Sequence, residues 1–226
     1  MKSGSQIINN LGLGLGEVLK RLTMANLGLA AVLRAALPDA DDTRLHALGR
    51  FLANAATAGQ TPLHRLFDVA GAGAPDAPTL VPAELTTVVR ALLNAQPDAA
   101  RKADGDGRLP VHAFCVSQSM LPVDAFVSVL RALLDAYPGS VGSRDRDGQL
   151  PLHVLCKQAH VPCIVGALPL LLAQLRDDKP DSPVTLPGDR NPLHLLISRA
   201  PEIQLGTYRA MLAAAPRQAS EVDEHG

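Results

Sequence analysis

The chain has 226 residues, of which 47% are hydrophobic and 19% are charged, and its formal net charge is −1. This length allows one large domain or two small ones, and the hydrophobic fraction is too high for a disordered chain. The even charge balance disfavours a general nucleic-acid-binding protein, which would carry a basic excess. The shortage of aromatic residues, with no Trp, two Tyr and four Phe, also disfavours base-stacking and sugar-binding surfaces.

The first 57 residues contain three helical patterns. Leucines recur at helical spacing over residues 11–22, although each of three glycines in this stretch weakens a helix by ~1 kcal/mol relative to Ala. A second pattern covers residues 27–37 and ends before Pro38, and a third covers residues 43–48. Terminal units of repeat arrays are usually atypical. We therefore expect residues 1–57 to form degenerate N-terminal capping helices.

Beyond residue 57 the chain repeats itself. A tetrapeptide of the form Xaa-Pro-(Leu/Val)-His occurs at residues 61–64, 109–112, 150–153 and 191–194, with histidines 48, 41 and 41 residues apart. A second element of the form Arg-Ala-(Leu/Met)-Leu, followed by a proline, occurs at residues 90–97, 131–138 and 209–216. In both cases where the next tetrapeptide follows directly, its histidine stands 15 residues after that proline. Two elements that keep one offset indicate a repeated structural unit.

Each unit is predicted to contain two helices and a turn. The proline of the tetrapeptide suits the first turn of a short helix, where its missing N–H would have no partner anyway. A longer helix comes next, with apolar residues on one face from Phe126 to Tyr137, and it ends before Pro138 because the residue before proline avoids the α region. Asp-Gly pairs ending at Gly107 and Gly148 predict tight turns with positive φ. Since a single helix pair cannot bury its apolar face, we expect an all-α helical-repeat solenoid.

Residues 144–153 read Arg-Asp-Arg-Asp-Gly-Gln-Leu-Pro-Leu-His, which resembles the hairpin and first-helix motif of ankyrin repeats, Asp-x-x-Gly-x-Thr-Pro-Leu-His. Residues 104–112 give a second match, and the resemblance covers roughly residues 58–226. It implies about five helix pairs with hairpin-like loops, acting as a protein-binding scaffold. The chain departs from the family in its period of about 41 residues instead of 33.

A further departure concerns the threonine that, in the family, helps to cap the first helix and bonds the histidine. Only Thr61 keeps it among the four tetrapeptides. At the other end of the chain, residues 223–226 follow Pro216 at the spacing at which residues 145–148 follow Pro138. We therefore expect residues 58–226 to form an ankyrin-like array that continues in a longer protein.

Histidine and cysteine residues raise the question of a metal or catalytic site. Three histidines precede a cysteine by three residues, a spacing found in zinc sites; the pairs are His112 and Cys115, His153 and Cys156, and His160 and Cys163. Two of these cysteines occupy one repeat position, where the other units have Phe67 and Ile197, which indicates core packing. Catalysis would need one differentiated set of groups, whereas these histidines recur in every unit. We expect no catalytic residue, no cofactor and no metal ion. The alternatives are a metal-binding or hydrolytic site built from these residues, and a structural spacer within a larger protein.

The remaining candidates for function are polar residues of the hairpin loops, because exposed turns on a rigid scaffold often carry binding residues. The predicted partner-binding residues are Arg108, Arg144, Arg146, Gln149 and Arg190. We expect a concave face, built from hairpin tips and first-helix surfaces, to bind another protein. Nucleic acid and membrane are not expected as partners, and the chain is expected to act as a monomer.

Cysteine usage and hydropathy predict the compartment. Three cysteines do not form a disulfide framework and favour a reducing compartment, so we expect a cytoplasmic protein. The most apolar run, from Val161 to Leu175, is shorter than the ~20 residues that a membrane-spanning helix needs. It is predicted to be a buried helix.

Overall fold

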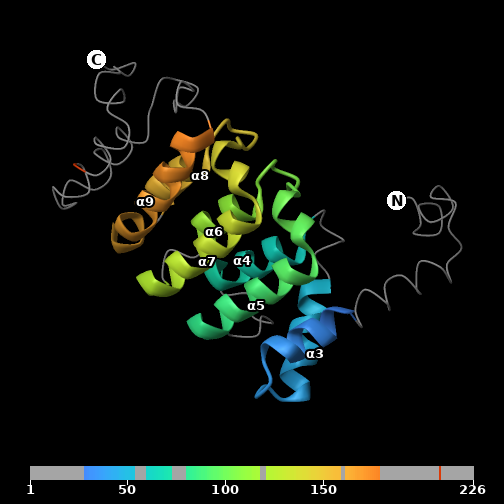
Figure 1. Cartoon of the computed structure of the whole chain (residues 1–226). Coiled ribbons are helices and arrows are strands. Elements are labelled where there is room, and N and C mark those ends of the chain that lie inside the picture. The colour runs from blue at the N-terminus through green and yellow to red at the C-terminus, as the bar shows by residue number, and fades with distance from the viewer. Residues whose placement is uncertain are drawn as a thin grey trace, which may run out of the picture.

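The computed structural model describes residues 28–53, 60–72, 80–117, 121–158 and 161–178, together with residue 209. All regular structure in these residues is helical (Figure 1), which confirms the predicted all-α class for them. The predictions for residues 11–22, for the fourth tetrapeptide at 191–194 and for residues 223–226 lie outside the described residues, as does Arg190.

Short and long helices alternate along the chain. The short helices begin at the proline of a tetrapeptide, as predicted; they are α4 (Pro62–Ala72), α6 (Pro110–Ser117) and α8 (Pro151–Gln158). Each is followed by a longer helix; these are α5 (Pro82–Ala95), α7 (Val123–Ala136) and α9 (Val161–Asp178). Helices α5 and α7 end two residues before Pro97 and Pro138, which confirms the predicted ends.

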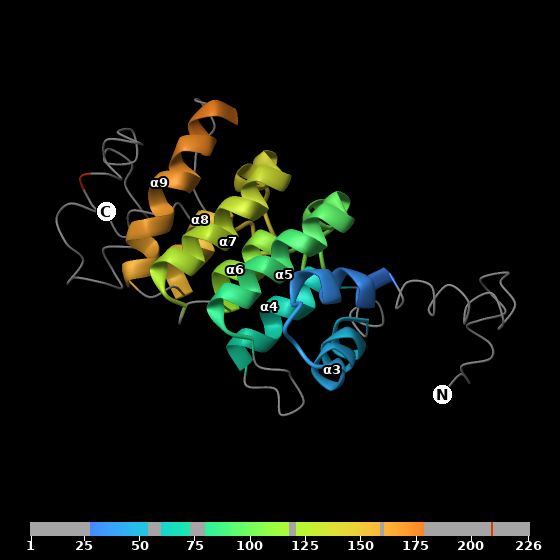
Figure 2. The same ribbon diagram turned by 60° about the horizontal axis from the view of Figure 1, so that its bottom comes forward.

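Helices of one kind pack against the next helix of the same kind (Figure 2). Helix α4 contacts α6 and α6 contacts α8, while α5 contacts α7 and α7 contacts α9. Three buried aromatic rings join the two kinds of helix: the ring centroids of Phe67 and Phe114 are 5.1 Å apart, and those of Phe114 and Phe126 are 4.6 Å apart. One hydrophobic core therefore runs through successive helix pairs.

Two short 3-10 helices were not predicted from the sequence. Helix η2 (Pro97–Arg101) follows α5, and η3 (Pro138–Gly142) follows α7. Both begin at the proline that ends the preceding long helix, and both bury two small side chains; these are Ala99 and Ala100 in η2, and Ser140 and Val141 in η3. The proline therefore redirects the chain into a packed turn and not into a free loop.

The N-terminal part contains a helix over residues 28–36 and helix α3 (Asp42–Ala53), which packs against α4. Helix α3 begins one residue before the pattern predicted over residues 43–48, because Asp41 caps it: its Oδ1 accepts the Arg44 backbone N–H at 2.7 Å. His46 is exposed, whereas the histidines His64, His112 and His153 of the tetrapeptides are buried. The histidine of α3 therefore does not have the packing role of the tetrapeptide histidines.

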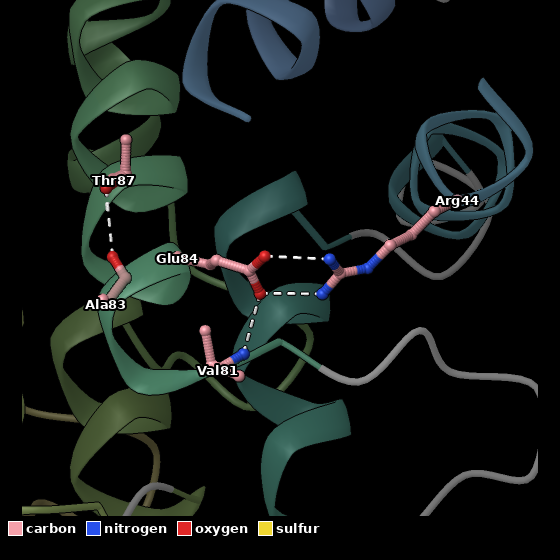
Figure 3. A network of polar contacts seen from close by, with 5 residues as sticks. All are labelled: Arg44, Val81, Ala83, Glu84 and Thr87. Atoms are coloured by element: carbon pink, nitrogen blue, oxygen red, sulfur yellow. Dashed lines mark hydrogen bonds and ion pairs between the residues drawn. The ribbon is translucent and has the colours of Figure 1, made fainter. Parts of the chain in front are cut away.

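An ion pair joins α3 to the start of α5 (Figure 3). Arg44 Nη1 and Nη2 donate to Glu84 Oε1 and Oε2 at 2.8 and 2.7 Å. Glu84 Oε2 also accepts the Val81 backbone N–H at 2.9 Å, which caps α5. The hydrogen bond from Arg44 holds the pKa of Glu84 below its usual 4.5, against the opposing effect of burial. Glu84 thus stabilises its own helix and attaches the N-terminal helices to it.

We expect the variant Glu84→Gln to lower the free energy of unfolding by about 1 kcal/mol, because the bidentate, partly buried ion pair with Arg44 is lost. A double-mutant cycle with Arg44→Met, measured by urea unfolding at neutral pH, should give a favourable coupling energy. Since the pKa of Glu84 is lowered, this coupling is present above about pH 4.5 and is lost as the pH falls below it. Arg50→Met, an exposed change on the same helix, is the control. A coupling energy of zero at neutral pH would contradict this role.

Candidate binding surface

The two Asp-Gly turns have the same internal hydrogen bonds. Asp104 Oδ1 accepts the backbone N–H groups of Asp106 and Arg108, both at 2.9 Å. Asp145 Oδ1 accepts the two equivalent N–H groups at 3.0 and 2.8 Å. Each turn contains a glycine with positive φ, as predicted; the values are 73° at Gly107 and 74° at Gly148. The first aspartate of each turn is therefore a structural residue that holds the backbone.

The tetrapeptide histidines connect one unit to the next. His64, His112 and His153 are fully buried, and in each the backbone N–H of the residue before proline donates to Nδ1, at 3.3, 3.2 and 3.1 Å. Because Nδ1 accepts a hydrogen bond, a neutral ring carries its proton on Nε2. Nε2 of His64 donates to the carbonyl of Arg108 at 2.8 Å, and Nε2 of His112 donates to that of Gln149 at 3.2 Å. Each of these two histidines thus ties its short helix to the following turn.

The threonine implied by the family resemblance contributes to this arrangement only once. Thr61 Oγ1 lies 2.8 Å from His64 Nδ1. Leu109 and Leu150 occupy the same position in the next two units, where the backbone N–H still donates to Nδ1 although the residue has no hydroxyl. The hydroxyl is therefore not needed to orient the histidine.

Neighbouring turns also contact each other directly. The Arg146 backbone N–H donates to the Asp106 carbonyl at 3.1 Å. The approach is close, because a Cβ added at Gly107 would lie 3.2 Å from both Arg146 N and Arg146 Cγ. We call residues 101–108 and 142–149 together the turn surface. A backbone hydrogen bond joins its two segments, and His64 and His112 donate to the Arg108 and Gln149 carbonyls within them.

The predicted partner-binding residues differ in their exposure within this surface. Arg144 and Arg146 are exposed, whereas Arg108 and Gln149 are half-buried. Arg144 Nη1 donates to the Gly148 carbonyl at 2.7 Å, so this side chain also supports its own turn. The Gln149 side chain accepts a hydrogen bond from Lys157 Nζ at 3.0 Å, a contact that was not predicted from the sequence. Of the four predicted residues that the structure describes, Arg146 has the side chain most available to a partner.

The short helices contribute less than predicted to an exposed face. Residues 109–115 and 150–156 are buried throughout, and exposure begins only at Val116 and Lys157. Helix α6 contains no charged residue at all, and a short helix that is apolar on most sides is expected to pack on most sides. The expectation of a face built partly from first-helix surfaces is therefore wrong for these residues, whereas the adjoining turns do carry exposed polar groups.

The cysteines are packed as core residues. Phe67, Cys115 and Cys156 share one repeat position and are all buried, which confirms the packing interpretation for these three residues. Burial raises the pKa of Cys115 far above its usual value and that of Cys156 to about 12. Cys163 donates to the Leu121 carbonyl at 3.4 Å. In the part of the chain that the structure describes, no group of three or more His, Cys, Asp or Glu residues is placed to hold a metal ion.

The neutral state of His112 makes the fold sensitive to pH. Burial lowers its pKa below the usual 6.5, and this effect exceeds the opposing influence of the Asp145 carboxylate and the Gln149 carbonyl. As the pH falls below about 6.5, the unfolded chain therefore binds this proton before the folded chain does. The stability that depends on the neutral ring is present above that pH and is lost below it.

Replacing His112 by Gln should lower the free energy of unfolding at neutral pH by about 1–3 kcal/mol, because buried hydrogen-bonding groups lose their partner. The variant should also lose less stability than the original chain between neutral pH and pH 5, since this titrating group is gone. Urea unfolding of both proteins across that range measures the difference. Equal pH dependence in the two proteins would show that His112 does not titrate in this way.

Compared with known proteins, the chain matches no family model and no curated sequence. The ankyrin-like interpretation therefore depends on the chain's own repeated residues. Within the described ranges, no helix combines the length and the apolar character needed to cross a bilayer. The candidate site for a function is therefore the pair of turns that His64 and His112 hold in place.

Proposed function

We propose that this chain is a non-enzymatic protein-interaction module, a helical-repeat solenoid of ankyrin-like helix pairs that binds a partner protein through its turn surface. The repeated tetrapeptide, the packing of α4, α6 and α8 in order, and the matching order of α5, α7 and α9 support the solenoid. The shared geometry of the two Asp-Gly turns supports the likeness to ankyrin hairpins.

The single observation that carries the binding role is the fixed position of the turns. His64 and His112 hold the carbonyls that precede the next short helices, and the Arg146 amide joins the two turns. A partner that docks on such a surface loses little free energy to ordering of the backbone, because the loops are already held in place. Long cationic side chains on fixed turns suit recognition of another protein.

The enzymatic alternative has less support. A nucleophilic cysteine needs a lowered pKa and some exposure, whereas Cys115 and Cys156 are buried with raised pKa values. The ring nitrogens of His64 and His112 are already engaged by backbone groups. The spacer alternative differs from the binding role only in having no saturable partner. We further propose that the chain acts as a monomer. We also propose that it lies in the cytoplasm, because its three cysteines form no disulfide, as is usual in a reducing compartment.

Reversing one exposed charge tests this role. The variant Arg146→Glu in the full chain should reduce recovery of saturable partners about tenfold, because the side chain lies at the centre of the turn surface. Thermal unfolding should not change, since the Arg146 side chain makes no ion pair within the described residues. Affinity capture from cells of the source organism, quantified by mass spectrometry, provides the measurement.

Arg131→Glu is the matched control, because Arg131 is exposed on α7, away from the turns. It should leave recovery unchanged. Equal loss with both variants, or no loss with Arg146→Glu, would contradict binding through the turn surface. Recovery of no saturable partner would favour the spacer.

A further inference from the structure

The exposed side chains of the turn surface include more basic than acidic residues, although the chain as a whole is nearly neutral. The exposed basic side chains of this surface are Arg101, Lys102, Arg144 and Arg146, and its exposed acidic side chains are Asp106 and Asp147. The whole chain has a formal net charge of −1, so this excess of cations is local. A local basic patch attracts acidic partners even where the protein as a whole is nearly neutral.

Hydrogen bonds turn two of the interleaved aspartates towards their own backbone, although both keep their charge and the formal net charge of the turn surface is +1, from five Arg or Lys residues and four Asp residues. The carboxylates of Asp104 and Asp145 face their own backbone, where each accepts two N–H groups. Asp145 is buried, with 8% of its surface exposed. Asp106 faces a cation of its own turn, since its Oδ2 lies 3.6 Å from Arg108 Nη1. Asp106, which faces Arg108, and Asp147 therefore remain as the exposed carboxylates among the cations.

Two of the cations are positioned by the fold. The Arg101 guanidinium lies over the Tyr137 ring, 5.1 Å from its centroid, so this side chain extends across from η2 to the end of α7. The Arg146 side chain extends from the residue whose amide bonds the Asp106 carbonyl, and its Cγ lies against Gly107. Arg101 is therefore held against the ring at the end of α7 and Arg146 next to the backbone of the neighbouring turn, and an extended ligand could contact both.

The surface fits an acidic protein segment better than a nucleic acid. The phosphate backbone is recognised by a dense basic stripe, and single-stranded bases need aromatic platforms. Tyr137, the aromatic residue beside this surface, is half-buried and already covered by Arg101. The exposed carboxylates of Asp106 and Asp147 repel a ligand that carries an anion at every position, as a nucleic acid does, but they can accept hydrogen bonds from peptide N–H groups. A polypeptide with spaced carboxylates meets both requirements.

Resting on the proposed function, we infer that the partner docks on the turn surface through an extended acidic segment, whose Asp or Glu side chains pair with Arg101, Lys102 and Arg146. These pairs are exposed, so they contribute mainly to the rate of association and to specificity, and they weaken as salt is added.

Fluorescence anisotropy with the full chain tests this inference. The probes are a labelled ten-residue glutamate peptide in which Glu alternates with Gly, a glutamine peptide in which Gln alternates with Gly, and a single-stranded RNA of similar length. We expect binding of the glutamate peptide only, with an affinity that falls as salt increases. Arg146→Glu should weaken it about tenfold, whereas Arg146→Lys should retain most of it because the charge remains. Arg131→Glu, outside the turn surface, should bind as the original chain does, and circular dichroism checks that each variant folds.

Three outcomes would overturn the inference: no binding of the glutamate peptide, binding unaffected by Arg146→Glu, or tighter binding of the RNA. Its failure is distinguishable from failure of the proposed function. If a captured partner depends on Arg146 while the glutamate peptide does not bind, the turn surface binds a protein of different chemistry. If no captured partner depends on Arg146, the proposed function itself fails.

Discussion

A buried, neutral imidazole that accepts at Nδ1 and donates at Nε2 is the interaction on which the rest of this structure depends. Nδ1 of His112 takes the N–H of Leu109 at the start of its own helix, and Nε2 reaches the Gln149 carbonyl of the following unit. One side chain thus completes a helix start and fixes the position of a turn. Protonation would place a second N–H against the Leu109 amide, which is why the ring must stay neutral.

This interaction determines where binding groups can lie. With their histidines and cysteines facing inwards, short helices α6 and α8 are occupied by packing, and the turns next to them carry exposed polar groups that the proposed ligand could contact. The turns themselves are rigid, because one aspartate of each is used by its own backbone. The exposed arginines therefore extend from a framework that does not need to rearrange when a partner arrives.

Much of this fold could be predicted from local sequence. Proline at a helix start, apolar residues at helical spacing and Asp-Gly turns are signals that act over a few residues, and the described helices agree with them. The 3-10 helices were missed because Pro97 and Pro138 signal the end of a helix but do not specify the conformation of the next residues. The pattern over residues 43–48 predicted a helix there, but its start is set by Asp41, whose side chain caps α3.

The candidate site was less predictable, because its contacts are not local. The histidine-to-carbonyl bonds join residues that are 44 and 37 positions apart, and Arg44 meets Glu84 across 40 positions. The sequence identified Arg144 and Arg146 as turn residues, but it could not separate Arg146 from Arg144, which donates to the Gly148 carbonyl. It also could not indicate that Gln149 is engaged by Lys157.

The claim that the turns form one preformed surface is tested most directly by amide hydrogen exchange in the free, full-length chain. The Arg146 amide, which bonds the Asp106 carbonyl of the neighbouring turn, should exchange slowly, at a rate close to that of the buried part of α7. Exchange of this amide at the rate of an unprotected turn would mean that the turns move independently, and the turn surface would then not exist before a partner binds.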